Sequence, residues 1–214
     1  PIFPETFSMQ FKKNHVYHVY NRGNNKERTF FTVENYDYFL RKIKKEWSSQ
    51  CDIIAYCLMP NHFHFMLIPN EEGCKYVNLG GRESQLQQLS RTIGKTLSSY
   101  TRAINKQRGN TGNLFQQKTK SKNITDTSLE NPAYHLYDYL RTCFHYIHNN
   151  PVAAGMTDKP GDWPFSSMNE YLYLDENLIC NTIQSFNILG MKQVDVKNQL
   201  VEINDELVAI VQAT

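Results

Sequence analysis

Apolar positions along the chain follow two different periods, and their order predicts the secondary structure. Residues 15–22 and 52–58 are rich in β-branched and aromatic side chains, which is typical of β-strands. A third such run, residues 62–68, follows a short break at residues 59–61, and two runs this close predict an antiparallel hairpin. Residues 33–48 instead carry apolar side chains at helical spacing, which predicts a helix.

A second, longer helix is predicted after a glycine-containing loop at residues 70–83. From Leu86 to Ile104 apolar residues recur every three or four positions, which places them on one stripe of a helix. We expect residues 113–124 to return to the sheet as an extended segment and residues 132–150 to form another helix. The order β-α-β-β-α-β-α predicts an α+β sandwich, a mainly antiparallel sheet with helices covering one face.

The composition is that of one ordinary domain with an appendage. A chain of 214 residues is long enough to bury a full core. No apolar run approaches the roughly 18 to 20 residues that span a bilayer, and the first residues lack the pattern of a signal peptide. The five cysteines lack Cys-x-x-Cys spacing, so we expect reduced, packed thiols in a cytoplasmic protein without membrane association.

The net charge of +2 conceals an uneven distribution of charge. Residues 84–125 contain no acidic residue, whereas acidic residues collect near the C-terminus. A stretch whose charged residues are all basic, in a nearly neutral protein, predicts a polyanion-binding face, with a solvated basic surface as the alternative. The basic residues of this stretch, which we assign to nucleic-acid binding, are Arg91, Lys95, Arg102, Lys106, Arg108, Lys118, Lys120 and Lys122.

Two histidines stand two residues apart in the third β-prone run. On a strand, His62 and His64 share one face, while Phe63 and Phe65 point to the other. Two adjacent imidazoles make half of a metal site. Because histidine is also an ordinary strand residue, the pair indicates a metal only if another element supplies a third ligand.

The helix predicted over residues 132–150 can supply that ligand together with a nucleophile. Tyr146 and Asn150 are four residues apart, so they lie beside each other at the edge of the apolar stripe. His145 and His148 project to the opposite side. Opposite two imidazoles, an amide oxygen and a tyrosine hydroxyl fit metal-assisted attack on a phosphodiester. The alternative for Tyr146 is a half-buried aromatic, and Asn150, which precedes a proline, is expected at the frayed helix end.

Five motifs, taken in order, resemble the REP-associated branch of the single-tyrosine, HUH-type transposases. The similarity covers about residues 10–173. It depends on the order and spacing of all five motifs, because each one alone is weakly specific. The motifs are residues 17–23 (YHVYNRG), 56–64 (YCLMPNHFH), 112–116 (GNLFQ), 146–155 (YIHNNPVAAG) and 163–167 (WPFSS).

The resemblance implies an enzyme with an RRM-like, ferredoxin-like fold that cleaves and rejoins single-stranded or hairpin DNA. Such enzymes form a 5′-phosphotyrosine intermediate, leave a free 3′-hydroxyl and use Mg²⁺ or Mn²⁺. By motif, His62 and His64 are similar to the metal-binding pair, Tyr146 to the nucleophile and Asn150 to the residue that completes the metal shell. Arg22, in the first motif, joins the residues assigned to nucleic-acid binding.

Two features depart from the resemblance. The family usually carries arginine after the Phe-Gln of the fourth strand, where this chain has Gln117 and Lys118, and lysine lacks bidentate phosphate geometry. Residues 174–214 lie outside the motifs, so we divide the chain into a catalytic domain, 1–173, and a C-terminal helical extension. That extension contacts DNA, forms a dimer or packs against the domain, which leaves both a monomer and a homodimer open.

Two other functions fit parts of the sequence. One is a metal-dependent nuclease or phosphodiesterase that uses water, with Tyr146 structural. The other is a non-catalytic RRM-like binding module, against which the aromatic RNA-binding signature is missing. Tyr100, the rival nucleophile, falls in the apolar stripe of its helix and is expected in the core. A DNA-processing role predicts a cytoplasmic, nucleoid-associated protein.

Overall fold

The central feature of the computed structural model is a four-stranded antiparallel sheet with the strand order β2-β3-β1-β6. The structure describes residues 9–79, 82–125, 136–174 and 178–197. The predicted hairpin is confirmed, and the extended segment after the long helix returns to the sheet beside β1. The α+β class and the ferredoxin-like strand order are therefore as expected. The strands are β1 (Tyr17–Arg22), β2 (Cys51–Met59), β3 (His62–Pro69) and β6 (Lys120–Asn123).

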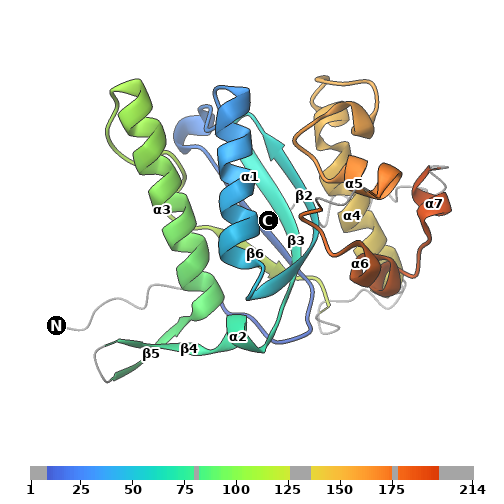
Figure 1. Ribbon diagram of the computed structural model, residues 1–214, viewed down its shortest axis with the longest axis horizontal. Coiled ribbons are helices and arrows are strands. Elements are labelled where there is room, and N and C mark those ends of the chain that lie inside the picture. Colours follow the sequence, from blue (N-terminus) through green and yellow to red (C-terminus); the bar gives the residue numbers. More distant parts are fainter. Residues whose placement is uncertain (1–8, 80–81, 126–135, 175–177, 198–214) are drawn as a thin grey trace.

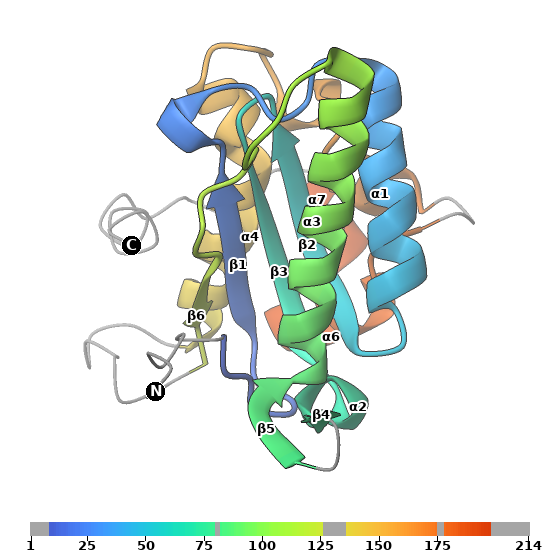
Figure 2. The same cartoon turned by 90° about the vertical axis from the view of Figure 1, so that its left-hand side faces the viewer.

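Two long helices cover one face of this sheet (Figures 1 and 2). They are α1 (Val33–Trp47) and α3 (Gln88–Arg108), which pack against each other. Side chains at helical spacing on α1 meet alternate residues of β3: the ring centroids of Phe39 and Phe63 lie 5.7 Å apart, and those of Trp47 and Phe65 lie 5.0 Å apart. This aromatic layer forms the larger part of the core.

A third helix, α4 (Leu136–Ala153), covers the opposite face, which differs from the predicted one-sided arrangement. Figure 1 shows α1 and α3 on one side of the strands and α4 on the other, and Figure 2 shows α4 behind the sheet. The reason lies in β2, where residues 54–58 are all buried, so both faces of this strand need cover. The predicted start of this helix, at residues 132–135, falls outside the described residues.

The segment expected as a loop at residues 70–83 contains secondary structure. It forms the short helix α2 (Glu71–Cys74) and a hairpin of β4 (Tyr76–Leu79) and β5 (Arg82–Gln87). Leu86 therefore lies in β5 and not in the long helix. The buried Gln87 side chain accepts a hydrogen bond from Phe11 N and donates to Phe11 O and Cys74 O. These partners are distant in sequence, which is why local periodicity did not reveal them.

The outer edge of β2 is covered by segments from the C-terminal part of the chain. Leu58 N donates to Phe165 O (2.9 Å), and Asn181 N donates to Ile53 O (2.8 Å). Residues 178–197 thus pack on the domain, whereas 198–214 lie outside the described residues, and the boundary at 173 stays a prediction. Covering an edge strand in this way protects its free backbone groups. The helices beyond α4 are α5 (Met168–Tyr173), α6 (Thr182–Leu189) and α7 (Gln193–Lys197), and short 3-10 turns lie at Asn24–Lys26 and Pro160–Asp162.

The expectations about the cysteines and about Tyr100 can be compared with the structure. All five cysteines are free thiols, and four of them are buried, as predicted. Tyr100 is fully buried and donates a hydrogen bond to Thr29 O (2.9 Å), so it belongs to the core. Within the described residues, no helix has the length and apolar character needed to cross a membrane.

Gly23 lets the chain turn tightly out of β1, and we predict that Gly23→Ala destabilises the protein by about 1 to 3 kcal/mol. Gly23 N donates to Asn61 O (2.7 Å), and a Cβ atom at this position would lie 2.1 Å from the backbone oxygen of Glu27. The matched control is Gly94→Ala in α3, where no atom outside the neighbouring helix backbone lies within 4 Å of the added methyl. Helix propensity predicts that the control gains about 0.5 to 1 kcal/mol. Urea unfolding of both variants measures the difference, and equal effects would contradict the prediction.

Candidate functional site

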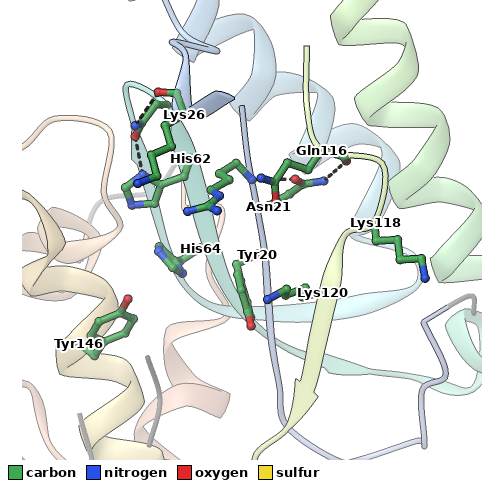
Figure 3. Close-up of a pocket in the computed structure, with 11 residues that line it drawn as sticks. Tyr20, Asn21, Lys26, His62, His64, Gln116, Lys118, Lys120 and Tyr146 are labelled. Atoms are coloured by element: carbon green, nitrogen blue, oxygen red, sulfur yellow. Dashed lines mark hydrogen bonds between the residues drawn. The ribbon is translucent and has the colours of Figure 1, made fainter. Parts of the chain in front are cut away.

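A pocket of about 540 Å³ opens where β1, β3, the segment before β6 and α4 meet (Figure 3). It brings together residues that are more than 120 positions apart in the chain, from Tyr20 to Tyr146. None of its lining residues is acidic. The pocket is lined by Tyr20, Asn21, Arg22, Lys26, Asn61, His62, His64, Gln116, Lys118, Lys120 and Tyr146.

The hydrogen bonds around His62 define which of its nitrogens carries the proton. Asn61 Nδ2 donates to Lys26 O (3.1 Å), which orients the Asn61 amide with its oxygen towards His62. The nitrogen His62 Nδ1 lies 2.6 Å from Asn61 Oδ1 and must be the donor, because an amide oxygen can only accept. The neutral His62 ring therefore has its lone pair on Nε2.

The side-chain oxygen of Asn150 directs its own lone pair towards His62 Nε2. Its Nδ2 donates to Tyr146 O (2.8 Å), so its Oδ1 faces His62 Nε2 at 3.5 Å. Two acceptors that face each other repel unless a proton or a cation lies between them. Burial lowers the pKa of His62, against a contribution from Asn150 that favours the proton, and nearby Arg22 lowers this pKa further. The ring is then neutral, and a cation fits the gap better than a proton.

His64 is the more deeply placed of the two histidines. Its ring centroid lies 5.1 Å from that of His62, on the same face of β3, as the spacing predicted. Its Nδ1 lies 2.8 Å from Nε2 of His18, a buried residue of β1. Burial lowers the pKa of His64 well below its usual range, with smaller contributions from His18 and His62. Burial, followed by the charge of Lys122, lowers the pKa of His18 to about 3.

Tyr146 points from α4 towards His64 (Figure 3). The ring centroids of the two residues lie 5.5 Å apart, and the ring of His18 lies 6.0 Å from that of Tyr146. Burial raises the pKa of Tyr146, and a hydrogen bond from Asn150 partly opposes this rise. The tyrosine at rest is therefore a neutral, half-buried phenol at the wall of the pocket.

The flank of α4 arranges Tyr146 and Asn150 side by side, as the sequence predicted. Asn150 does not lie at a frayed helix end, because α4 continues through Pro151 to Ala153. His148 points away from the pocket, with Nε2 2.8 Å from Ser167 Oγ in the contact with the C-terminal segments.

The residues present fit a divalent cation with open coordination positions. Among the described residues, no group of three or more His, Cys, Asp or Glu side chains could hold a metal. The donors here are instead the two imidazoles of His62 and His64 and the amide oxygen of Asn150. Such a mixed set of nitrogen and oxygen donors suits Mn²⁺ and related divalent ions, and Mg²⁺ commonly keeps several waters at such sites.

The basic residues predicted to bind nucleic acid divide between two sides of the molecule. Arg22, Lys118 and Lys120 line the pocket. Lys122 lies opposite His18 in the β1–β6 pairing, on the same face of the sheet. The remaining residues belong to α3: Arg108 stacks on Phe31 at the end of this helix (3.7 Å), and the other four project within about 60° of one another, opposite the buried stripe. Those four are Arg91, Lys95, Arg102 and Lys106.

Several pocket residues were not predicted as site residues. Tyr20, Asn21 and Lys26 come from the first motif and the turn after it, and Gln116 donates its backbone N–H to Arg22 O (2.8 Å). His18 and Tyr20 are two residues apart on β1, as His62 and His64 are on β3, so the members of each pair share one face of their strand. This spacing was the sequence signal that could have identified the two residues of β1.

A search of solved structures found a related fold. The structure of a REP-associated tyrosine transposase bound to a REP hairpin superimposes with a TM-score of 0.53 at 20% sequence identity, covering 82% of this chain and 89% of that chain. No protein-family model and no curated protein sequence matches the chain. The resemblance drawn from the motifs is thus confirmed at the level of the fold.

The buried histidines predict that stability falls as the pH drops below about 6.5. His18, His64 and His148 are neutral in the folded state, and burial lowers the pKa of His18 and of His148 to about 3. The unfolded chain binds protons below its histidine pKa of about 6.5, whereas the folded chain does not, so each ring costs about 1.4 kcal/mol per pH unit. Urea unfolding should show a loss of at least about 4 kcal/mol between pH 7.5 and 5.5, because burial also lowers the pKa values of His145 and His62. A flat profile, or unfolding without proton uptake in titration calorimetry, would contradict this.

Proposed function

We propose that this protein cleaves and rejoins DNA, single-stranded or in a hairpin, through a covalent intermediate on Tyr146. The observation that carries the proposal is the convergence of Tyr146 with His62 and His64 in one basic pocket. The structural neighbour, a tyrosine transposase bound to a hairpin, supports DNA as the substrate. The pocket suits a polyanion, since four of its lining residues, Arg22, Lys26, Lys118 and Lys120, are basic and none is acidic.

The proposed step forms one bond and breaks one. The Tyr146 oxygen attacks the phosphorus of a phosphodiester, forming an O–P bond, and the bond from phosphorus to the 3′ oxygen breaks. The phenol proton passes to solvent in the pocket, and a proton from solvent reaches the departing 3′ oxygen. The products are a 5′-phosphotyrosine and a free 3′-hydroxyl. Attack by a 3′-hydroxyl on that phosphotyrosine reverses the step and joins DNA without ATP.

The residues of the chain divide this work between binding and orientation. Mg²⁺ or Mn²⁺, when held by His62, His64 and Asn150, would supply Lewis-acid polarisation of the scissile phosphate. Asn150 lies one turn after the nucleophile, and its Nδ2 donates to the backbone oxygen of Tyr146, which holds its Oδ1 towards His62. Arg22 and Lys120 flank the pocket, where they can neutralise phosphate oxygens on either side of the scissile bond.

A covalent trap tests the nucleophile. Wild-type protein incubated with labelled hairpin DNA and Mn²⁺, then denatured, should retain label on the polypeptide. Tyr146→Phe should abolish this adduct, because it removes the attacking oxygen and keeps the ring. The matched control is Tyr139→Phe, two turns earlier on α4. The Tyr139 hydroxyl is buried and has no hydrogen-bond partner among the described residues, so its loss should leave the adduct intact.

The same trap separates the proposal from its rivals. Free cleaved ends produced by an active Tyr146→Phe protein would indicate a nuclease that uses water. Binding without cleavage by the wild type would indicate a non-catalytic module. An adduct lost equally in Tyr139→Phe and Tyr146→Phe would mean that the helix, and not the hydroxyl, is what the reaction requires.

The position of the lysines predicts which of them contact DNA phosphates. Lys118→Ala combined with Lys120→Ala should weaken binding of single-stranded DNA and reduce the slope of log K against log salt by about 1.4. Lys95→Ala combined with Lys106→Ala makes the same change in charge on the outward side of α3, and should leave this slope nearly unchanged. Fluorescence anisotropy over a salt series measures both. An equal reduction in the two double variants would show that the DNA extends over α3.

A further inference from the structure

His18 does not line the pocket but contacts His64, one of the proposed metal ligands. It lies on β1 opposite Met66, while Tyr20 lies opposite His64, so His18 and His64 are diagonal neighbours on one face of the sheet. Their rings meet through His18 Nε2 and His64 Nδ1 at 2.8 Å, and their centroids are 5.0 Å apart. Both side chains are buried, at 1% and 7% exposure, so water does not compete for this contact.

The contact allows two arrangements of protons. Two neutral imidazoles carry two N–H groups between them, and one of these lies in the hydrogen bond. If His64 Nδ1 is the donor, His64 Nε2 has a free lone pair and the second proton is on His18 Nδ1. If His18 Nε2 is the donor, the second proton is on His64 Nε2. A ring nitrogen that carries a proton cannot bind a cation, so only the first arrangement leaves His64 able to act as a ligand.

The other nitrogen of His18 makes this residue unusual. His18 Nδ1 is buried and has no hydrogen-bond partner among the described residues. Leaving a buried polar atom unpaired is unfavourable, and an apolar ring of the same shape would avoid this cost. The other rings around His18, those of Tyr20 at 4.7 Å and Tyr146 at 6.0 Å between centroids, provide no hydrogen-bond partner for this nitrogen. Packing therefore does not explain a histidine here.

We propose that His18 is a positioning residue, which accepts the Nδ1 proton of His64 and so directs the Nε2 lone pair of His64 into the pocket. This inference rests on the proposed function, because it assumes that His62 and His64 hold a divalent cation. It adds a positioning residue on β1 to a site whose proposed ligands come from β3 and α4. In this arrangement the proton of the neutral His18 ring is on its unpaired Nδ1, and His64 Nε2 carries no proton.

The test compares His18→Phe, which keeps an aromatic ring but has no acceptor, with His18→Gln, whose side-chain oxygen can replace Nε2. Full-length protein is titrated with Mn²⁺, and free Mn²⁺ is measured by electron paramagnetic resonance. His18→Phe should bind Mn²⁺ about 10- to 100-fold more weakly than the wild type. His18→Gln should restore affinity to within about threefold. The control His148→Phe replaces a histidine that is equally buried and also has an unpaired Nδ1, but lies outside the pocket, so its Mn²⁺ affinity should not change.

The tautomer can be read directly in the unmodified protein. With ¹⁵N-labelled histidine and diamagnetic Mg²⁺, long-range ¹H–¹⁵N correlation spectra distinguish a protonated from an unprotonated ring nitrogen. We expect His64 to carry its proton on Nδ1 and His18 to carry its proton on Nδ1 as well. A proton on His64 Nε2 in the Mg²⁺-bound state overturns the proposal, even if His18→Phe fails to fold.

The outcomes separate this inference from the proposed function. If the wild type binds Mn²⁺ and His18→Phe binds it equally well, only the role of His18 fails. If the wild type binds no Mn²⁺, the metal site fails and the role of His18 fails with it. If His18 controls Mn²⁺ affinity as expected but the covalent trap on Tyr146 fails, the metal site stands and the strand-transfer reaction is wrong.

Discussion

The antiparallel pairing of β1 with β3 is the constraint on which the site depends. With Tyr20 opposite His64 and Arg22 opposite His62, the side chains at the pocket end of this face are polar or aromatic, while Val19 and Phe63 face α1 and α3. A slip of one residue in this register would move every side chain of the strand to the other face. The histidines would then enter the aromatic core, and phenylalanines would line the pocket. The core and the site are therefore specified by the same pairing.

Burial on both faces of the sheet gives the site its electrostatic character. Because α4 covers β2 and part of β3, the side chains of His64 and His18 are largely removed from solvent, and burial keeps their rings neutral. A neutral imidazole has one ring nitrogen with a free lone pair, which binding of a cation requires. The basic residues stay at the more exposed rim, with Arg22 and Lys120 open to solvent. The pocket thus combines buried, neutral imidazoles at its base with exposed, positively charged side chains at its rim.

Local periodicity predicted the parts of the site that belong to single elements. The period of two placed His62 and His64 on one face, and the helical period placed Tyr146 beside Asn150. What remained hidden depends on pairing between distant segments. The contact of His18 with His64 joins residues 46 positions apart, and the hairpin after β3 is tied down by Gln87 and Phe11, which are 76 apart. The positive charge of α3 could be predicted from the sequence. The face of the sheet that this helix covers could not, because no local pattern specifies it.

The burial of Tyr146 has opposite consequences before and after the proposed attack. Before it, burial raises the pKa of the phenol, so the nucleophile is protonated and unreactive until a phosphate and its counter-charges enter the pocket. After the proposed attack, the same packing against His64 and His18 would limit the approach of water to a phosphotyrosine. Hydrolysis would release the energy that rejoining needs, whereas a waiting 3′-hydroxyl can use it. In the proposed reaction a half-buried tyrosine would therefore be a slow nucleophile at rest and a protected intermediate once joined, which would favour strand transfer over simple cleavage.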